Sequence, residues 1–316
     1  FRNCALQLLE SAGEPMMDSG VLGGLACCLL LVGCTNRTHF DSSSKLDELN
    51  CEDGVTLGFT PDAPGPDTER YRCFAYSADL LGGEPIRGLV WKEPEGDVLL
   101  HHAALRATSE LRPTDGAFDC EPMPEDAVSL HIWVSGGSQL TLPPDVGIAL
   151  PTGARTLIIE AHAFRLGWAP AGMASLKICR SATTPLKLAG WLGLRAPVPA
   201  IRPGTVETST SSCLLSEPWH MLFAWPHMHL AGKEFHGALL HGTLRTPTVD
   251  IDPWDFYHQF TYPIDLSGEA GDVIETQCTW SNPTAEYVLP GIYTQNEMCT
   301  HALIGWPASA ARCAYQ

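Results

Sequence analysis

The sequence has few charged residues and especially few basic ones. Asp, Glu, Lys and Arg make up 17% of the 316 residues, and 36 Asp and Glu stand against 19 Lys and Arg, for a formal net charge of −17. A surface of this sign repels phosphates, so we exclude nucleic acid as a partner. No segment shows strong helical periodicity either, so we expect little helix.

The sequence also lacks an apolar run long enough to span a bilayer. Its longest, "VLGGLACCLLLVGC", has the length of a signal peptide. The run ends at Cys34 and resembles the lipobox of bacterial lipoproteins, although Asp18 stands where a basic residue is usual. We expect residues 1–34 to be an export leader and 35–49 a polar tether. The protein would then be periplasmic or on the cell surface, and attached to a membrane only through a lipid on Cys34.

Cysteine is plentiful, but C-x-x-C pairs are missing. The chain has 12 cysteines, an even number, and eight of them are spread along the body of the chain. Without C-x-x-C pairs this favours disulfides over zinc knuckles, and it indicates an oxidising compartment.

Glycine and proline divide the rest of the chain into short segments. There are 29 Gly and 25 Pro, and between them lie apolar stretches such as "GVTLGFTP", "VSLHIWVSG" and "DVIETQCTW". Segments of this kind read as strands joined by turns. We predict an all-β protein with two tandem antiparallel sandwiches of jelly-roll type, residues 50–185 and 186–316.

One short segment suggests a metal site. Residues 224–235 read "AWPHMHLAGKEF", with His227 and His229 one residue apart. On a strand these two rings would project from the same face and converge on one point. The alternative is a half-exposed strand that carries two histidines by chance.

Other candidate ligands lie elsewhere in the chain. "VLLHHAALRA" places His101 and His102 at the end of an apolar strand, where both reach one metal only if the strand bends or ends. His162 in "LIIEAHAF" and Met298 in "NEMC" complete the set. Taken alone, His162 would be a core histidine and Met298 a packing residue. Together, two histidines and a thioether suit copper, whereas three histidines suit copper or zinc.

From about residue 50 to 313 these segments, in this order, resemble the copper type II, ascorbate-dependent monooxygenases, which include the peptidylglycine- and dopamine-hydroxylating enzymes. The resemblance rests on the His-His pair, "EAHAF", "FAWPHMHLAGKEF", "FTYPIDLSGEAGDVIETQCTW" and "NEMC". It implies two coppers per chain, facing each other across a gap between the domains. An electron-transfer copper would be held by His101, His102 and His162, and an oxygen-activating copper by His227, His229 and Met298.

The resemblance implies further contacts. His220, which matches a family histidine, would lie behind the ligands and orient their strand; the alternative is an ordinary buried histidine. Three disulfides match family bridges: Cys73–Cys120, Cys213–Cys313 and Cys278–Cys299. The pair Cys51–Cys179 remains by elimination. A further family bridge is missing, because Thr108 stands where a cysteine would be.

The substrate positions depart from the family. Trp225 replaces the arginine that clamps a peptide carboxylate, and Thr300 and Ala302 replace an asparagine and a tyrosine. Glycine-extended peptides are therefore not expected as substrates. Glu160 resembles an acidic residue of the dopamine branch; it could pair with an amine or cap a turn.

These patterns predict a monooxygenase that hydroxylates a C–H bond of a small organic substrate with O2 and a one-electron donor such as ascorbate. Two alternatives stay open: a copper-binding or electron-transfer lipoprotein, and a surface protein with inert sites.

Overall fold

The structure is a computed structural model that describes residues 51, 54–62, 68–114, 116–134, 137, 139–165, 167–168, 171–181 and 185–314. The expected leader, the tether and Cys34 lie outside these residues. In the described part, no helix is long and apolar enough to cross a membrane.

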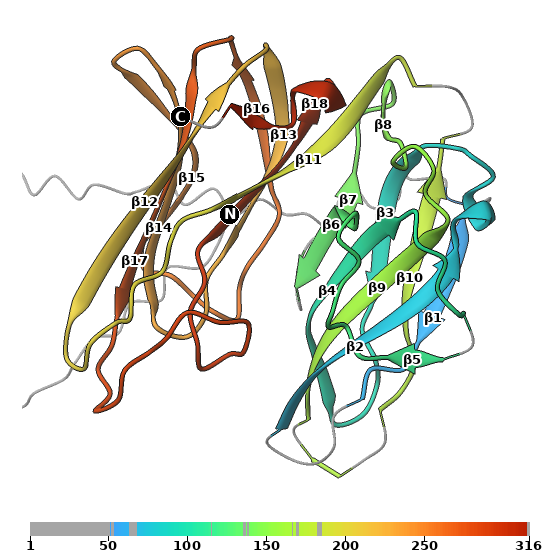
Figure 1. Cartoon of the computed structure of the whole chain (residues 1–316), viewed down its shortest axis with the longest axis horizontal. Helices are drawn as coiled ribbons and strands as arrows, with labels where there is room; N and C mark the ends of the chain where they lie inside the picture. The colour runs from blue at the N-terminus through green and yellow to red at the C-terminus, as the bar shows by residue number, and fades with distance from the viewer. Residues whose placement is uncertain are drawn as a thin grey trace, which may run out of the picture. The chain divides into compact units, whose positions relative to one another are not determined.

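Strands make up 56% of the described residues and helices 3%, which confirms the all-β prediction. Within the described ranges, the helical part consists of two short 3-10 turns, η2 (Ala78–Leu81) and η3 (Ala308–Ala310). The described strands form three sheets, and most neighbouring strands within a sheet run antiparallel (Figure 1).

A five-stranded sheet in the N-terminal half carries the first set of histidines. Its spatial order is β5 (Ala117–Phe118), β2 (Thr68–Ser77), β9 (Thr156–Arg165), β4 (Val98–Thr108) and β6 (Val128–Val134). The central strands β4 and β9 are buried on both faces over most of their length, as their continuous apolar runs require.

A second five-stranded sheet lies in the C-terminal half. Its order is β15 (Leu244–Ile251), β14 (Gly232–His241), β17 (Val273–Ser281), β12 (Val206–Leu215) and β19 (Cys313–Ala314). In β12, half-buried residues alternate with exposed ones, as in a sheet with one solvated face.

The third sheet has nine strands and contains residues of both halves. Its order is β1 (Val55–Phe59), β10 (Ala174–Arg180), β3 (Ile86–Lys92), β8 (Val146–Ile148), β11 (Lys187–Arg195), β18 (Thr300–Trp306), β13 (Trp219–His227) and β16 (Tyr262–Gly268), with β7 (Leu140–Thr141) paired to β3. The expected domain boundary at residue 186 falls directly before β11. Because β11 pairs in parallel with β8 and antiparallel with β18, one sheet runs through that boundary.

The apolar core has two main parts. One includes the fully buried Leu100 and Leu105 and lies mainly in the N-terminal half, although it also contains Leu222 and Ile304 of the C-terminal half. The other is built around Phe235 and Trp280 of the C-terminal half.

Four disulfides in the described part of the chain link cysteines that are 21 to 128 residues apart in sequence. They are Cys51–Cys179, Cys73–Cys120, Cys213–Cys313 and Cys278–Cys299. All four expected pairs are confirmed, including the pair reached by elimination. They agree with an extracellular or otherwise oxidising compartment.

Candidate metal centre and adjoining cavity

The adjacent histidines of β4 point to one place because the strand is irregular there. The register between β4 and β9 shifts between Leu100 and His102, and both His101 and His102 are buried. The bend that the sequence required is therefore a β-bulge near the start of β4, not a strand end as expected. The Nδ1 atoms of the two rings are 3.2 Å apart. Two nitrogens bound tetrahedrally to one ion at the usual bond length are about 3.3 Å apart.

His162 of β9 joins this pair. One ring nitrogen from each of His101, His102 and His162 lies within 4.8 Å of the others. The Nε2–H of His162 donates to the carboxylate of Glu69 at 2.9 Å, and its Nδ1 is buried without a partner in the described part of the chain. A second-sphere carboxylate that fixes the tautomer is typical of histidine ligands. The unpartnered Nδ1 therefore fits a metal ion, and the three nitrogens fit copper or zinc.

Glu69 and Tyr71 of β2 tie this group to the segment before Met298. Thr294 donates both its hydroxyl and its backbone N–H to Glu69, and the Tyr71 hydroxyl donates to the carbonyl of Ile292. The Tyr71 ring stacks on His162 with centroids 4.1 Å apart. Burial raises the pKa of Glu69, but hydrogen bonds from His162 and Thr294 outweigh it and lower the value to about 2. Glu69 is thus an anion beside the metal-ligand candidates.

Burial keeps the histidines of β4 neutral, as metal binding requires. It lowers the pKa of His101 to about 3 and that of His102 well below the ordinary value, and neighbouring histidines add to both shifts.

The second group of candidate ligands begins at the end of β13. His227 is the last residue of that strand, and His229 lies in the turn that follows. The expectation that both project from one face of a strand is therefore wrong for His229. Even so, the two ring centroids are 5.0 Å apart and both side chains are buried.

Hydrogen bonds determine which nitrogen of each ring is available. His227 donates from Nδ1 to Gln259 at 2.6 Å, and His229 donates from Nδ1 to the carbonyl of Asn296 at 3.1 Å. Both rings are therefore left with Nε2, and that of His229 is buried with no partner among the described residues. Burial lowers the pKa of His229 to about 4 and that of His227 well below its usual range. These are two further neutral donors that fit a metal.

Glu297 holds His229 and Met298 in place. Its carboxylate is 1% exposed and accepts hydrogen bonds from the backbone N–H groups of His229, Ala231 and Met298 and from the indole N–H of Trp280. Burial raises its pKa to about 7, against the effect of these donors. The segment "NEMC" was singled out for its methionine. The role of the neighbouring Glu297 emerges only when its four donors, three of them from other segments of the chain, are seen together.

Met298 lines a cavity of about 520 Å³ together with His227 and His102. The disulfide Cys278–Cys299 fixes the residue that follows it to β17. The structure thus places the thioether beside the cavity that His227 borders, as the ligand prediction requires.

The two groups of histidines are not separated where they come closest. The ring centroids of His102 and His227 are 5.8 Å apart, and Phe256 stacks on His101 at 4.5 Å. The expected gap between two facing sites is therefore absent between these two rings.

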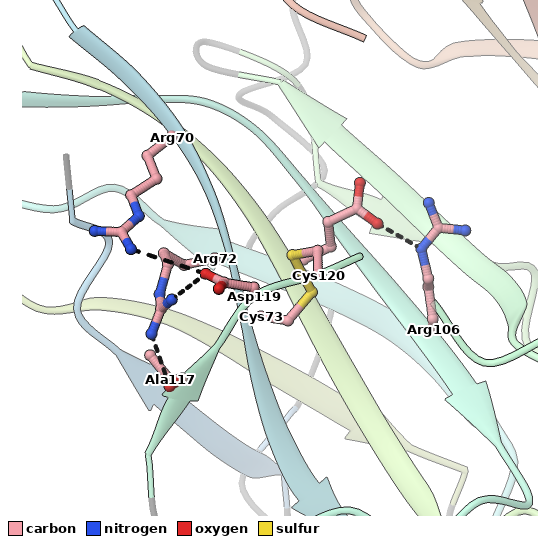
Figure 2. Close-up of a disulfide and its surroundings, with 8 residues drawn as sticks. Arg70, Arg72, Cys73, Arg106, Ala117, Asp119 and Cys120 are labelled. Atoms are coloured by element: carbon pink, nitrogen blue, oxygen red, sulfur yellow. Dashed lines mark hydrogen bonds and ion pairs between the residues drawn. A yellow bond between two sulfur atoms is a disulfide. The ribbon is translucent and has the colours of Figure 1, made fainter. Parts of the chain in front are cut away.

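The cavity also contains the candidate substrate residues Glu160, Trp225 and Thr300. Trp225 stacks on His227 with centroids 4.9 Å apart. Glu160 already has a counter-ion, because Arg106 lies 2.9 Å from its carboxylate. Figure 2 shows the ion pair of Arg106 together with the neighbouring Cys73–Cys120 disulfide.

His220 lies away from the ligands. It is near the start of β13, whereas His227 ends that strand, and its ring bonds Ser267 and Asp265 and packs on Trp306. The structure thus places His220 in a surface network rather than behind the ligand rings.

Comparison with known proteins gives one informative match. No curated protein matches the chain. A solved structure described as "Structure of allantoicase" covers 72% of this chain and 83% of its own at 11% identity, but its TM-score of 0.21 carries no argument. Residues 189–316 match the family "Copper type II ascorbate-dependent monooxygenase, C-terminal domain". Those residues contain His227, His229 and Met298, so the C-terminal part of the chain is similar to the C-terminal domain of the copper type II ascorbate-dependent monooxygenases.

Proposed function

We propose that the protein is a copper-dependent monooxygenase that hydroxylates a C–H bond of a small organic substrate, with O2 and a one-electron donor such as ascorbate. The family implies dependence on copper and ascorbate. The observation that carries the proposal is that His102 of one donor group and His227 and Met298 of the other line one cavity, and that each group has a buried nitrogen without a partner among the described residues: His162 Nδ1 in one and His229 Nε2 in the other.

The donor sets fit copper in both places. His101, His102 and His162 would hold one ion, and His227, His229 and Met298 the other. Soft sulfur favours Cu(I), and imidazole serves both oxidation states. A zinc site at the second position would leave the thioether unexplained. When bound, copper supplies the electron transfer and the oxygen chemistry that side chains alone cannot provide.

The protein itself supplies position and exclusion of water. Glu69, Gln259 and the carbonyl of Asn296 each accept the N–H of a histidine ring and so direct its other nitrogen inward. The contact between His102 and His227 brings the two donor groups together across the protein's two halves. Phe256 covers His101 and keeps that ring from solvent.

The cavity argues against two substrate classes. Trp225 cannot form the paired hydrogen bonds by which an arginine would clamp a peptide carboxylate. Glu160 pairs with Arg106, so an amine would have to displace that guanidinium. A small molecule with another means of recognition fits better.

Copper content and oxygen consumption test the proposal. The full chain should bind about two coppers, one for each donor group. With ascorbate, it should consume O2 and add one oxygen atom to a compound that mass spectrometry detects in a substrate screen. Met298→Ile should keep the fold and lose most hydroxylation. The exposed Met173 offers a matched control, and Met173→Ile should change neither reading. Full turnover by Met298→Ile would contradict the role of the thioether.

A copper-binding or electron-transfer protein is the second candidate. It is favoured by the contact between the two histidine groups and by the altered substrate positions Trp225 and Ala302. Two coppers without product or oxygen consumption would support it. No bound copper would leave a protein with inert sites.

The proposal also includes the protein's location and partners. The protein would act outside the cytoplasm, in the periplasm or on the cell surface, and would be attached to a membrane only through a lipid on Cys34. Its partners would be the substrate, O2 and the reductant.

A further inference from the structure

One of the three arginines that line the cavity has no counter-ion. Arg70 lies 3.8 Å from Asp119, and Arg106 pairs with Glu160 at 2.9 Å. Arg195, at the end of β11, forms no ion pair or hydrogen bond with any residue that the structure describes. A guanidinium at the wall of a substrate-sized cavity is available for a ligand.

The sheet places Arg195 in line with the second histidine group. In the register of the long sheet, Arg195 is paired with Thr300, and Thr300 is paired with His227. Paired residues of neighbouring strands share a face. Arg195, Thr300 and His227 thus form a row across β11, β18 and β13, and its two ends are about 10 Å apart, or two strand spacings. All three line the cavity.

Hydrogen-bond donors dominate the part of the cavity wall around Arg195 and Thr300. The Thr300 hydroxyl has no partner among the described residues, and the buried indole N–H of Trp225 lacks an acceptor there. Together with the guanidinium of Arg195 they can supply several donors to one group. A group that carries two acceptor oxygens and a negative charge matches them, because guanidinium and carboxylate pair in a fork.

The acidic residues of the cavity do not compensate Arg195. Glu69 bonds His162 and Thr294, Asp119 pairs with Arg72, and Glu160 pairs with Arg106. Only Glu121 of the four acidic lining residues lacks a partner in the described structure, and it follows Cys120, which is bonded to Cys73 of β2 in the other sheet. The net charge of −17 acts over longer range, and salt screens exposed charges beyond about 8 Å.

We propose that Arg195, with Thr300 and Trp225, binds the carboxylate of the substrate, so that the protein acts on small organic acids whose reacting carbon lies toward His227 and Met298. This inference rests on the proposed function insofar as it takes the cavity as the substrate site. Trp225 stands where the family has its carboxylate-binding arginine. Here the guanidinium would come instead from Arg195 on β11, two strands away from β13 in the sheet.

Three compounds with the same body but different end groups test it: 3-phenylpropanoate, 3-phenylpropanamide and 3-phenylpropylamine. Binding is measured by titration to the full chain, once copper-free and once loaded with Cu(I) without oxygen. The acid should bind about ten-fold or more tightly than the amide, as expected for a charged hydrogen-bonded pair. Arg195→Gln should bring the acid to the affinity of the amide, and Arg195→Lys should restore part of the difference.

Arg245→Gln is the matched control, because it removes one positive charge from β15, outside the cavity. It should leave the preference for the acid unchanged. Thermal unfolding of each variant verifies the fold. Equal binding of acid and amide, no binding of either, a preference that survives Arg195→Gln, or tighter binding of the amine would each overturn the proposal. The copper-free titration keeps the two proposals distinct, because it reads the carboxylate site even if the protein hydroxylates nothing.

Discussion

At the scale of single residues, the hydrogen bonds of each ring determine which nitrogen faces inward. Glu69, Gln259 and the carbonyl of Asn296 accept the outer N–H of His162, His227 and His229. These acceptors come from segments far along the chain. A ligand set can therefore be complete in sequence and still depend on partners outside its motif.

Substitution of Glu297 should lower stability and copper retention together. Glu297→Ala removes the acceptor of four buried N–H groups, including those of His229 and Met298. We expect a loss of about 3 kcal/mol or more in the free energy of unfolding, because unpaired buried donors are costly. Glu297→Gln keeps an oxygen for the three donors on Oε2 and should lose less. Urea unfolding measures the stability of each variant, and copper competition measures its copper retention. If Glu297→Gln lost as much of both as Glu297→Ala, the negative charge of Glu297 would be what the site requires, rather than its oxygen acceptors.

The buried His301 should make stability fall in acid. Burial lowers its pKa from 6.5 to about 3, and its ring bonds Thr248 and Thr276 in the core of the C-terminal half. Between about pH 6.5 and 3, His301 binds a proton in the unfolded chain but stays neutral in the folded protein. Stability therefore decreases as pH falls through this window. The contribution is about 1.4 kcal/mol per pH unit.

His301→Gln should therefore reduce the slope of unfolding free energy against pH by about that amount, measured by urea unfolding between about pH 6 and 4. The slope is the readout, because altered packing shifts the free energy equally at each pH. Identical slopes for the variant and the wild type would refute the assignment.

At the scale of strands and turns, the candidate ligands lie close together, but in a local setting that differs from the one the sequence predicted. The pair His101-His102 implied a bend, and the structure has a bulge at Leu100–His102. The spacing of His227 and His229 implied one strand face, yet β13 ends at His227. The two ring centroids are nevertheless 5.0 Å apart, because a turn can also direct a ring inward. The prediction that both residues lie on one strand face was wrong, because nothing in the local sequence pattern marks where the strand's hydrogen bonding ends.

The segment that carries Met298 depends on one disulfide. Cys278–Cys299 spans 21 residues, and its removal as Cys278→Ala with Cys299→Ala should cost about 3 kcal/mol of stability. Because Cys299 follows Met298, copper at the second donor group should also be lost more readily. Thermal unfolding and copper competition measure the two effects.

The bridge Cys213–Cys313 provides the comparison. It spans 100 residues and joins β12 to β19, so its removal should cost somewhat more stability, about 4–5 kcal/mol, with little effect on copper. If both double variants lost copper equally, the effect of Cys278–Cys299 would be general destabilisation rather than position.

At the scale of the whole molecule, β11 makes two predicted sandwiches share one sheet. The sequence suggested the boundary near residue 186, where a second set of strand-like segments begins. It gave no sign of the parallel pairing of Lys187–Ala189 with Val146–Ile148, because three residues of pairing leave no pattern. That pairing places β11, and Arg195 at its end, between the two halves. The row from Arg195 to His227 is thus a property of the assembled sheet.

Glu69 links the two halves, so its substitution should act on both. Its carboxylate bonds His162 in one and Thr294 in the other. Glu69→Gln should weaken copper binding at His101, His102 and His162 about ten-fold or more, as expected when a carboxylate behind a histidine ligand is lost. It should also speed hydrogen exchange at the backbone N–H of Thr294, which donates to the same carboxylate. Copper competition and exchange measured by mass spectrometry on peptides spanning residues 287–300 report the two changes. Glu207→Gln, which alters a surface ion pair with Arg202, is the control and should change neither. Weakened copper binding without faster exchange at Thr294 would mean that Glu69 supports His162 alone and does not connect the halves.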